Sequence, residues 1–397
     1  MNGFDFDSPR EHGFLPPMIT YVLCGLCGFV FVLQMMEGNG SSGGLAYPGF
    51  VDGLNVIQGE YWGLLTTFFL HGDFLHIAFN VYWLYRFGTA VEPYIGWKRF
   101  ALFWVIGTAL SSAVEVEVSG NTGIGASGFV YALFGLIWIG GRTDHYLARI
   151  VDNQVVVLFI VWLFLCMGLT WTGVWAIANA AHVGGLAFGC LCGYAFINRE
   201  EENRSIRVTA SAITILAFLP LFYAPWSSTW NLAQAEKAYE GQKYERALSY
   251  FDRVHLKVYE GYVAYCRADG LTQLGRTDEA VAAYKELFSI ADTDLANSAS
   301  YNSYAWILAT TSDDKVRDPQ EAIRYALMAC EKDDYKDSAY IDTLAAAYAS
   351  AKQFDQAVQW QQKALALNQS DDLVKEMKER LSLYQTHQTY RDPAPRR

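Results

Sequence analysis

Long apolar stretches dominate the first 225 residues of the chain, whereas shorter amphipathic stretches follow from Trp230 onward. A bilayer core about 30 Å thick needs a helix of about 20 mostly apolar residues to cross it. The stretches that approach this length number seven: 16–36, 74–91, 99–118, 127–141, 153–172, 178–197 and 206–225. The pattern predicts an all-α fold, in which a polytopic membrane bundle of six helices plus one precedes a soluble helical region.

Positive charges of this membrane half lie in alternate segments. Residues 37–73, 119–126 and 173–177 contain neither Lys nor Arg. All the cations lie in the other segments: Arg10, Arg86, Lys98, Arg99, Arg142, Arg149, Arg199, Arg204 and Arg207. The positive-inside rule therefore predicts a cytoplasmic N-terminus and an extracytoplasmic region after residue 225. The acidic N-terminal segment shows no organellar transit pattern, so a prokaryotic cell membrane is the expected location.

Polar side chains from three expected spans fall at one depth of the membrane, near its outer face. His76 and Asn80 lie at the start of span 74–91, Ser127 opens span 127–141, and His182 lies early in span 178–197. Ionisable residues within a bilayer are costly, so they mark candidate functional sites. Glycine-rich residues 120–125 precede the short span that Ser127 opens, which indicates non-helical backbone beside protein or water.

These residue types suit hydrolysis by a serine nucleophile. A neutral histidine such as His182 can accept the proton of the Ser127 hydroxyl as general base. The oxyanion that follows needs preorganised donors, and His76, the Asn80 amide and the Ser127 backbone N–H are candidates. Tyr131, one helical turn after Ser127, is expected to pack against the imidazole.

No carboxylate is expected beside His182. Glu115 and Glu117, at the outer end of span 99–118, are expected to be solvated, so the site would be a Ser–His dyad and not a triad. Small residues at Gly128, Gly185 and Gly189 would let spans 127–141 and 178–197 pack closely, which would bring the serine towards the histidine.

The motifs that carry these residues resemble those of the rhomboid family of intramembrane serine proteases. The resemblance covers residues 14–200, and it rests on His71-x4-His76-x3-Asn80, Gly125-Ala126-Ser127-Gly128-x2-Tyr131 and Ala181-His182-x2-Gly185-x3-Gly189. It implies Ser127 as nucleophile and His182 as general base. It also implies His76 and Asn80 as oxyanion stabilisers, with Gly125 and Tyr131 as supporting residues.

The resemblance further implies that Glu92, in a Val-Glu-Pro run, has a structural role. It implies membrane-spanning proteins as substrates, cut near the outer part of the membrane at small residues in helices that unwind easily. No metal or cofactor is expected. Many members have Trp-Arg ahead of the second span, where this chain has Trp62-Gly63, which bears on how the first outer loop is anchored.

A different class of function stays open. Polar residues can hold membrane helices together by hydrogen bonds, so the alternative is a catalytically inactive membrane scaffold that acts by binding proteins. The retention of Ser127, His182, His76 and Asn80 favours the protease.

The region after Trp230 contains a recurring pattern with small residues at Ala247, Ala280, Ala322 and Ala357. Its period of about 34 residues resembles tetratricopeptide repeats, with an insertion near residues 310–317. Upstream small residues lie at Ala235, Ala268 and Ala345. Such a solenoid presents a groove for a peptide or partner protein, and a helical spacer is the alternative interpretation.

Composition adds two limits. The chain of 397 residues is 52% hydrophobic, which excludes a disordered protein, and its net charge of −11 argues against nucleic acid as a partner. Cys266 and Cys330 are expected to be buried thiols. The expected domains are a cytoplasmic segment 1–15, a membrane protease domain 16–200, a seventh span and linker 201–229, a repeat domain 230–386 with a capping helix at 371–385, and a disordered tail 387–397.

Overall fold

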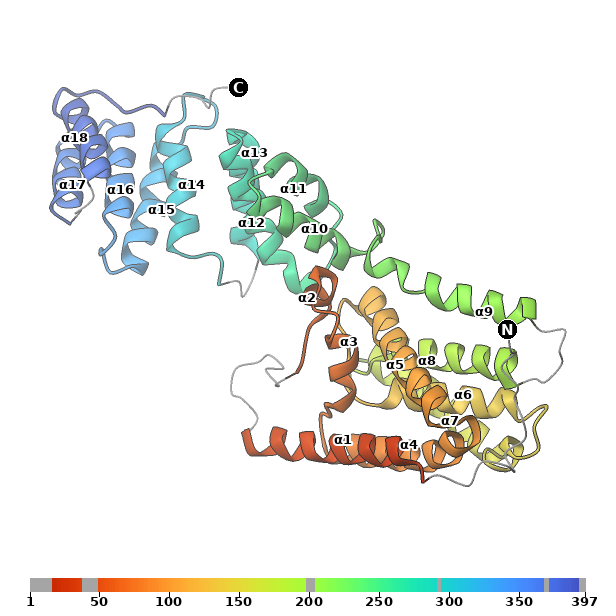
Figure 1. Cartoon of the computed structure of the whole chain (residues 1–397). Coiled ribbons are helices and arrows are strands. Elements are labelled where there is room, and N and C mark those ends of the chain that lie inside the picture. Colours follow the sequence, from red (N-terminus) through yellow and green to blue (C-terminus); the bar gives the residue numbers. More distant parts are fainter. Residues whose placement is uncertain (1–15, 38–48, 198–203, 291–293, 368–370, 393–397) are drawn as a thin grey trace. The chain divides into compact units, whose positions relative to one another are not determined.

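The computed structural model of the chain describes residues 16–37, 49–197, 204–290, 294–367 and 371–392. The expected cytoplasmic segment 1–15 lies outside the described residues, as do residues 201–203 and 393–397. Chain contacts divide the molecule into two compact units, Met1–Ala233 and Gln234–Arg397. The described residues are helical with connecting turns, so the expected all-α fold is confirmed (Figure 1).

The first unit is an integral membrane bundle. Among the described residues, five helices are long and apolar enough to cross a membrane, or six when a bent pair counts as one span. The five helices are α1 (Met18–Glu37), α5 (Trp97–Ser119), α7 (Asn153–Trp171), α8 (Asn179–Cys192) with the π-turn η3 (Gly193–Ile197), and α9 (Arg204–Leu216) with the 3₁₀ turn η5 (Leu219–Leu221). The shorter apolar helix is α6 (Ser127–Gly140), which matches the short span of the sequence analysis.

The second member of the bent pair is the helix that carries His76 and Asn80. Helix α3 (Gly63–Thr66) and the 3₁₀ turn η1 (Thr67–Phe69) meet α4 (Phe74–Ile95) at an angle of 103°. Asp73 accepts a hydrogen bond from the His76 backbone N–H at 2.9 Å, so it caps α4 and fixes where the helix begins. The preceding loop also contains α2 (Gly53–Gln58).

Glu92 ties α4 to the start of α1, which agrees with a structural role. Its carboxylate accepts hydrogen bonds from the Thr20 backbone N–H at 2.8 Å and from the Thr20 hydroxyl at 2.7 Å. The Ile19 N–H donates to the same carboxylate at 3.0 Å. These donors belong to the first turn of α1, whose N–H groups lack partners within the helix. A buried carboxylate at that end is also favoured by the helix dipole.

Helix α6 is the centre of the membrane unit. Most of its residues are buried, whereas α1 and α7 expose large parts of their surfaces. It packs along α8 and contacts α4 and α5 (Figure 1). The turn η2 (Leu147–Arg149) contacts α6 as well. A short, buried helix in the middle of longer ones holds its first residue, Ser127, inside the unit.

The second unit is a series of helix pairs that fits the expected repeats. Helix α10 (Ser228–Glu240) crosses the boundary between the units. After it come α11 (Tyr244–Phe251), η6 (Lys257–Tyr259), α12 (Glu260–Gln273), α13 (Thr277–Ser289), α14 (Ser298–Thr310), α15 (Pro319–Lys332), α16 (Ser338–Ser350), α17 (Phe354–Leu367) and α18 (Asp371–Gln385). The seven small alanines of the sequence pattern are all buried, at helix contacts. Membership of the tetratricopeptide family stays a prediction.

Two expectations for this unit have clear outcomes. Cys266 on α12 and Cys330 on α15 are free, buried thiols, and burial raises the pKa of each to about 12. Residues 387–392, expected to belong to a disordered tail, instead make specific contacts with α14. The Asp392 N–H donates to the Thr310 carbonyl at 3.0 Å, and the Arg391 guanidinium donates to the Ala309 carbonyl at 3.1 Å.

Candidate active site

Ser127 and His182 meet although they are 55 residues apart in the chain. Ser127 is the first residue of α6, and His182 lies in the first turns of α8. The His182 Nε2 and the Ser127 Oγ are 2.8 Å apart, a distance at which the hydroxyl can donate to an unprotonated ring nitrogen. The His182 Nδ1 has no hydrogen-bond partner among the described residues, and His182 is almost fully buried.

Glycine contacts between α6 and α8 bring the two residues together. A Cβ atom added to Gly185 would lie 2.0 Å from the Gly128 carbonyl oxygen, and one added to Gly189 would lie 1.9 Å from the Ala132 oxygen. A Cβ on Gly128 would lie 2.7 Å from the Ser111 Cβ of α5. The backbones of α6 and α8 therefore touch directly, as the small-residue pattern predicts, and the Ser–His distance is set by backbone packing.

Tyr131 holds the imidazole from the side of α6. Its ring stacks on that of His182 with centroids 4.8 Å apart and an interplanar angle of 30°. The Tyr131 hydroxyl donates to the Phe159 carbonyl of α7 at 3.0 Å. The phenol ring is therefore held by this hydrogen bond as well as by the helix that carries it. The Tyr131 ring therefore limits how the His182 imidazole can turn.

His76 and Asn80 lie together against Gly125, which is two residues before Ser127 in the chain. Gly125 has φ +106°, and a Cβ there would lie 2.6 Å from the His76 Nε2 and 3.2 Å from the Asn80 Nδ2. Only glycine fits this approach of the loop to α4. The Gly125 N–H donates to the Thr67 carbonyl at 2.9 Å. The buried Asn80 Nδ2 has no partner among the described residues, so it is a donor available to a bound group.

His71, which shares the first motif, is oriented by other contacts. Its backbone N–H donates to the Gln34 Oε1 at 3.2 Å, and its Nδ1 lies 3.2 Å from the Phe69 carbonyl oxygen. Its ring packs against that of His76 with centroids 5.0 Å apart. His71 is itself buried, and through this ring contact it supports His76.

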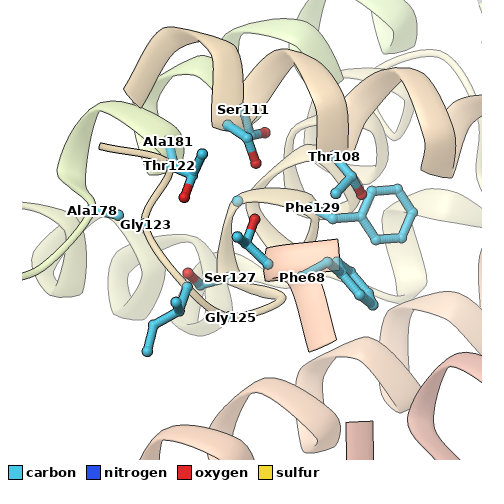
Figure 2. Close-up of a pocket in the computed structure, with 14 residues that line it drawn as sticks. Phe68, Thr108, Ser111, Thr122, Gly123, Gly125, Ser127, Phe129, Ala178 and Ala181 are labelled. Atoms are coloured by element: carbon cyan, nitrogen blue, oxygen red, sulfur yellow. The ribbon is translucent and has the colours of Figure 1, made fainter. Parts of the chain in front are cut away.

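A small cavity with both hydroxyl and apolar residues in its lining opens next to Ser127 (Figure 2). Its volume is about 20 Å³, which is enough for one water molecule. The hydroxyl groups that line it belong to Thr67, Thr108, Ser111, Ser112, Thr122 and Ser127. Such a wall can hold a water molecule by hydrogen bonds within a hydrocarbon environment, where water is otherwise absent.

Gly63, in the Trp62-Gly63 pair, allows a close contact in the segment that precedes α4. A Cβ on Gly63 would lie 2.5 Å from the Val51 Cβ. The Val51 carbonyl in turn accepts a hydrogen bond from the Thr122 hydroxyl at 2.8 Å. Thr122 lies in the loop that precedes Ser127, so the segment that contains Val51 and Gly63 is joined to that loop through this contact.

Glu115 is the site residue that sequence reasoning missed, and the expectation that it is solvated is wrong. It is 5% exposed, and its Oε2 accepts a hydrogen bond from the Ala181 N–H at 2.9 Å. The carboxylate oxygens of Glu117 are buried as well. One feature of the sequence could have indicated this role for Glu115. The N-cap residue of α8 is Ala178, which has no side-chain acceptor, so the first N–H groups of α8 need an acceptor from another segment.

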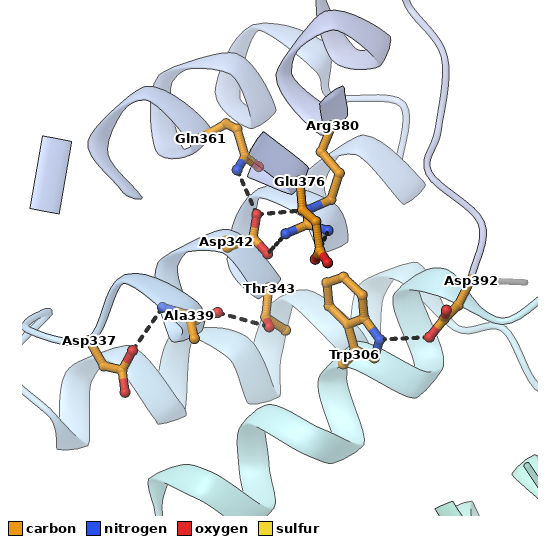
Figure 3. A network of polar contacts seen from close by, with 9 residues as sticks. All are labelled: Trp306, Asp337, Ala339, Asp342, Thr343, Gln361, Glu376, Arg380 and Asp392. Atoms are coloured by element: carbon orange, nitrogen blue, oxygen red, sulfur yellow. Dashed lines mark hydrogen bonds and ion pairs between the residues drawn. The ribbon is translucent and has the colours of Figure 1, made fainter. Parts of the chain in front are cut away.

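A second buried polar cluster lies in the repeat unit and has a structural explanation (Figure 3). The Arg380 guanidinium pairs with the Asp342 carboxylate at 2.9 Å, and the Gln361 amide donates to the same carboxylate at 2.5 Å. Arg380 also lies against the rings of Trp306, at 5.5 Å, and Tyr390, at 5.4 Å. The groups are paired with one another, as buried charges require.

The first unit is thus an all-helical membrane bundle in which Ser127 and His182 lie within hydrogen-bond distance beside a small cavity. Residues 58–199 match the Rhomboid domain family. The chain is 34% identical over 189 residues to the "Rhomboid protease GlpG" of Klebsiella pneumoniae subsp. pneumoniae, covering 47% of this chain and 65% of that protein. It is 30% identical over 172 residues to the protein of the same name from Salmonella paratyphi A, covering 43% and 60%.

The chain therefore spans slightly less than two thirds of the length of these relatives. The matches support the rhomboid family for the membrane unit, as the motifs of the sequence indicate. The matched family region, residues 58–199, contains the Ser–His pair, His76, Asn80 and Tyr131, whereas the repeat unit lies beyond it.

Proposed function

We propose that the chain is a serine-type intramembrane endopeptidase, with Ser127 as nucleophile and His182 as general base. The observation that carries the proposal is the 2.8 Å contact between the His182 Nε2 and the Ser127 Oγ, within a region that matches the Rhomboid domain. A serine hydroxyl becomes a competent nucleophile when an adjacent base takes its proton. A buried histidine in hydrogen-bond contact with it meets that requirement.

In the first step the Ser127 Oγ attacks the carbonyl carbon of the scissile peptide while the His182 Nε2 takes the hydroxyl proton. The carbonyl oxygen becomes an oxyanion, which His76, the Asn80 amide and the Ser127 N–H stabilise. The Ser127 N–H belongs to the first turn of α6, where N–H groups lack partners within the helix. Protonated His182 then donates its proton to the leaving amine, and an acyl-enzyme forms.

In the second step a water molecule hydrolyses the acyl-enzyme. The cavity lined by Ser111, Ser112 and Thr122 is the proposed source, since it has room for a water molecule beside Ser127. His182 takes a proton from this water as the new C–O bond forms, and it returns that proton to the Ser127 Oγ when the acyl group leaves. The reaction needs no metal or cofactor.

The proposed substrates are membrane-spanning proteins, cut near the outer part of the membrane at small residues. The relatives are named as rhomboid proteases, and the resemblance of the motifs to that family implies such substrates. The distribution of Lys and Arg supports a cytoplasmic N-terminus and an extracytoplasmic repeat unit. A prokaryotic cell membrane is the proposed location.

The test is cleavage of a transmembrane reporter with a helix-destabilised segment by the full-length protein in reconstituted membranes. We expect cleavage, together with labelling of the protein by a serine-directed fluorophosphonate. Absence of both would contradict the protease, and it would favour a scaffold that acts by binding proteins through its repeats.

The repeat unit is proposed to recruit substrates or an adaptor protein. Deleting residues 234–397 should reduce cleavage of natural partners by about tenfold or more, because tethering raises the effective concentration of a bound substrate. Cleavage of the generic reporter should be unchanged. The deletion keeps the Trp230 indole N–H bonded to the Phe222 carbonyl at 3.2 Å, within the membrane unit. Equal losses on both kinds of substrate would contradict recruitment.

A further inference from the structure

The start of α8 is held by a residue from another helix. The first N–H groups of a helix need acceptors, and the side chain at the N-cap position often supplies one to the second or third helical residue. Helix α8 begins at Asn179, and its N-cap residue is Ala178. The Glu115 carboxylate of α5 accepts instead from the N–H of Ala181, the third residue of α8, at 2.9 Å.

The position that Glu115 satisfies is next to the proposed base. Ala181 directly precedes His182, whose own N–H closes the first turn on the Ala178 carbonyl at 3.3 Å. A carboxylate at this end also has a favourable interaction with the helix dipole. The buried Glu115 side chain therefore fixes both where α8 begins and how its first turn is rotated.

Glu115 also lies close to the loop that leads to the proposed nucleophile. A Cβ added to Gly123 would lie 2.6 Å from the Ala178 Cβ and 3.6 Å from the Glu115 Cγ. Gly123 is four residues before Ser127 in the chain and has φ +66°. One side chain thus lies against the segments that carry both members of the dyad, and Ala178, Ala181 and Gly123 all line the cavity at Ser127.

We propose that Glu115 is a positioning residue that sets the Ser127–His182 geometry by capping α8 from α5. The inference rests on the proposed protease function. It predicts that the chemical step needs a hydrogen-bond acceptor at this place. Glu115 acts on His182 through the backbone of Ala181, to which it is hydrogen-bonded.

The experiment compares Glu115→Ala, Glu115→Gln and Glu117→Ala in the full chain, with kcat and KM measured on the transmembrane reporter. Glu115→Ala removes the acceptor, and we expect kcat to fall about 10- to 100-fold with KM nearly unchanged, as for a small displacement of a reacting group. Glu115→Gln keeps an oxygen that can accept from Ala181, so it should restore kcat to within about threefold of wild type.

Glu117→Ala is the matched control, because it removes a second carboxylate from the same end of α5. It should leave kcat unchanged. Thermal unfolding in detergent identifies variants that remain folded. Wild-type kcat in Glu115→Ala would overturn the proposal. So would a folded Glu115→Gln protein that stays as slow as Glu115→Ala, even if the alanine variant itself is unstable. Inactivity of the wild-type protein would instead count against the protease function.

Discussion

Replacing Ser127 with alanine should abolish cleavage of the transmembrane reporter, with the rate falling by at least about 1,000-fold. The substitution removes the Oγ that lies 2.8 Å from the His182 Nε2, so no acyl-enzyme can form. Fluorophosphonate labelling should disappear as well. Because the first residue of α6 stays small and the glycine contacts are untouched, the thermal unfolding midpoint should stay close to that of wild type.

Two further variants make this result specific to the dyad. His182→Asn should lose activity to nearly the same extent as Ser127→Ala, because residues that act as a unit do not contribute additively. Tyr131→Phe keeps the ring that stacks on His182 and removes only the hydroxyl bonded to the Phe159 carbonyl. It should retain most activity. Normal cleavage by Ser127→Ala would rule out Ser127 as the nucleophile.

The second large effect is expected at Gly189. Replacing it with valine places a branched side chain where a Cβ alone would come within 1.9 Å of the Ala132 carbonyl oxygen. Overpacking of a well-packed core costs about 1–3 kcal/mol, and more where backbone must move. We expect α6 and α8 to separate, with loss of the Ser–His contact, loss of cleavage and a lower unfolding midpoint in detergent.

Gly168 offers a matched control for this variant. It lies in the membrane helix α7, and a Cβ there would meet no atom within 4 Å. Gly168→Val should therefore leave cleavage and the unfolding midpoint nearly unchanged. Equal tolerance of valine at both glycines would show that α6 and α8 do not pack as closely as the backbone contact requires.

The features that the sequence predicts well depend on residue type and local spacing. Apolar length locates the membrane helices, and the small residues Gly128, Gly185 and Gly189 identify the faces of α6 and α8 that touch. The spacing of His76 and Asn80 puts both on one face of α4. Glycine at position 125 also has a local reason, since its positive φ and close approach to His76 exclude other residues.

Contacts between segments that are distant in the chain could not be predicted from residue type and local spacing. The carboxylate of Glu115 lies 66 residues from its partner Ala181, and its hydrophilic character alone suggests exposure at a helix end. The expected last span, 206–225, corresponds to the candidate span Arg204–Leu221, but the sequence did not predict the change from α9 to a 3₁₀ turn at Pro220. Residues 387–392 look like a polar tail, yet backbone and indole groups of α14 bind them.

Arrays of helical repeats usually unfold piecewise, because each repeat contacts only its immediate neighbours. The end of this array has an additional connection. Arg380 of α18 lies against Trp306 of α14, and the Trp306 indole donates to Asp392 at 3.0 Å. Both contacts join α14 to segments that follow α16 in the chain. Asp342 of α16 pairs with the same arginine. Helices α14 to α18 should therefore melt as a single cooperative block, so the second unit cannot be shortened from its C-terminal end one helix pair at a time.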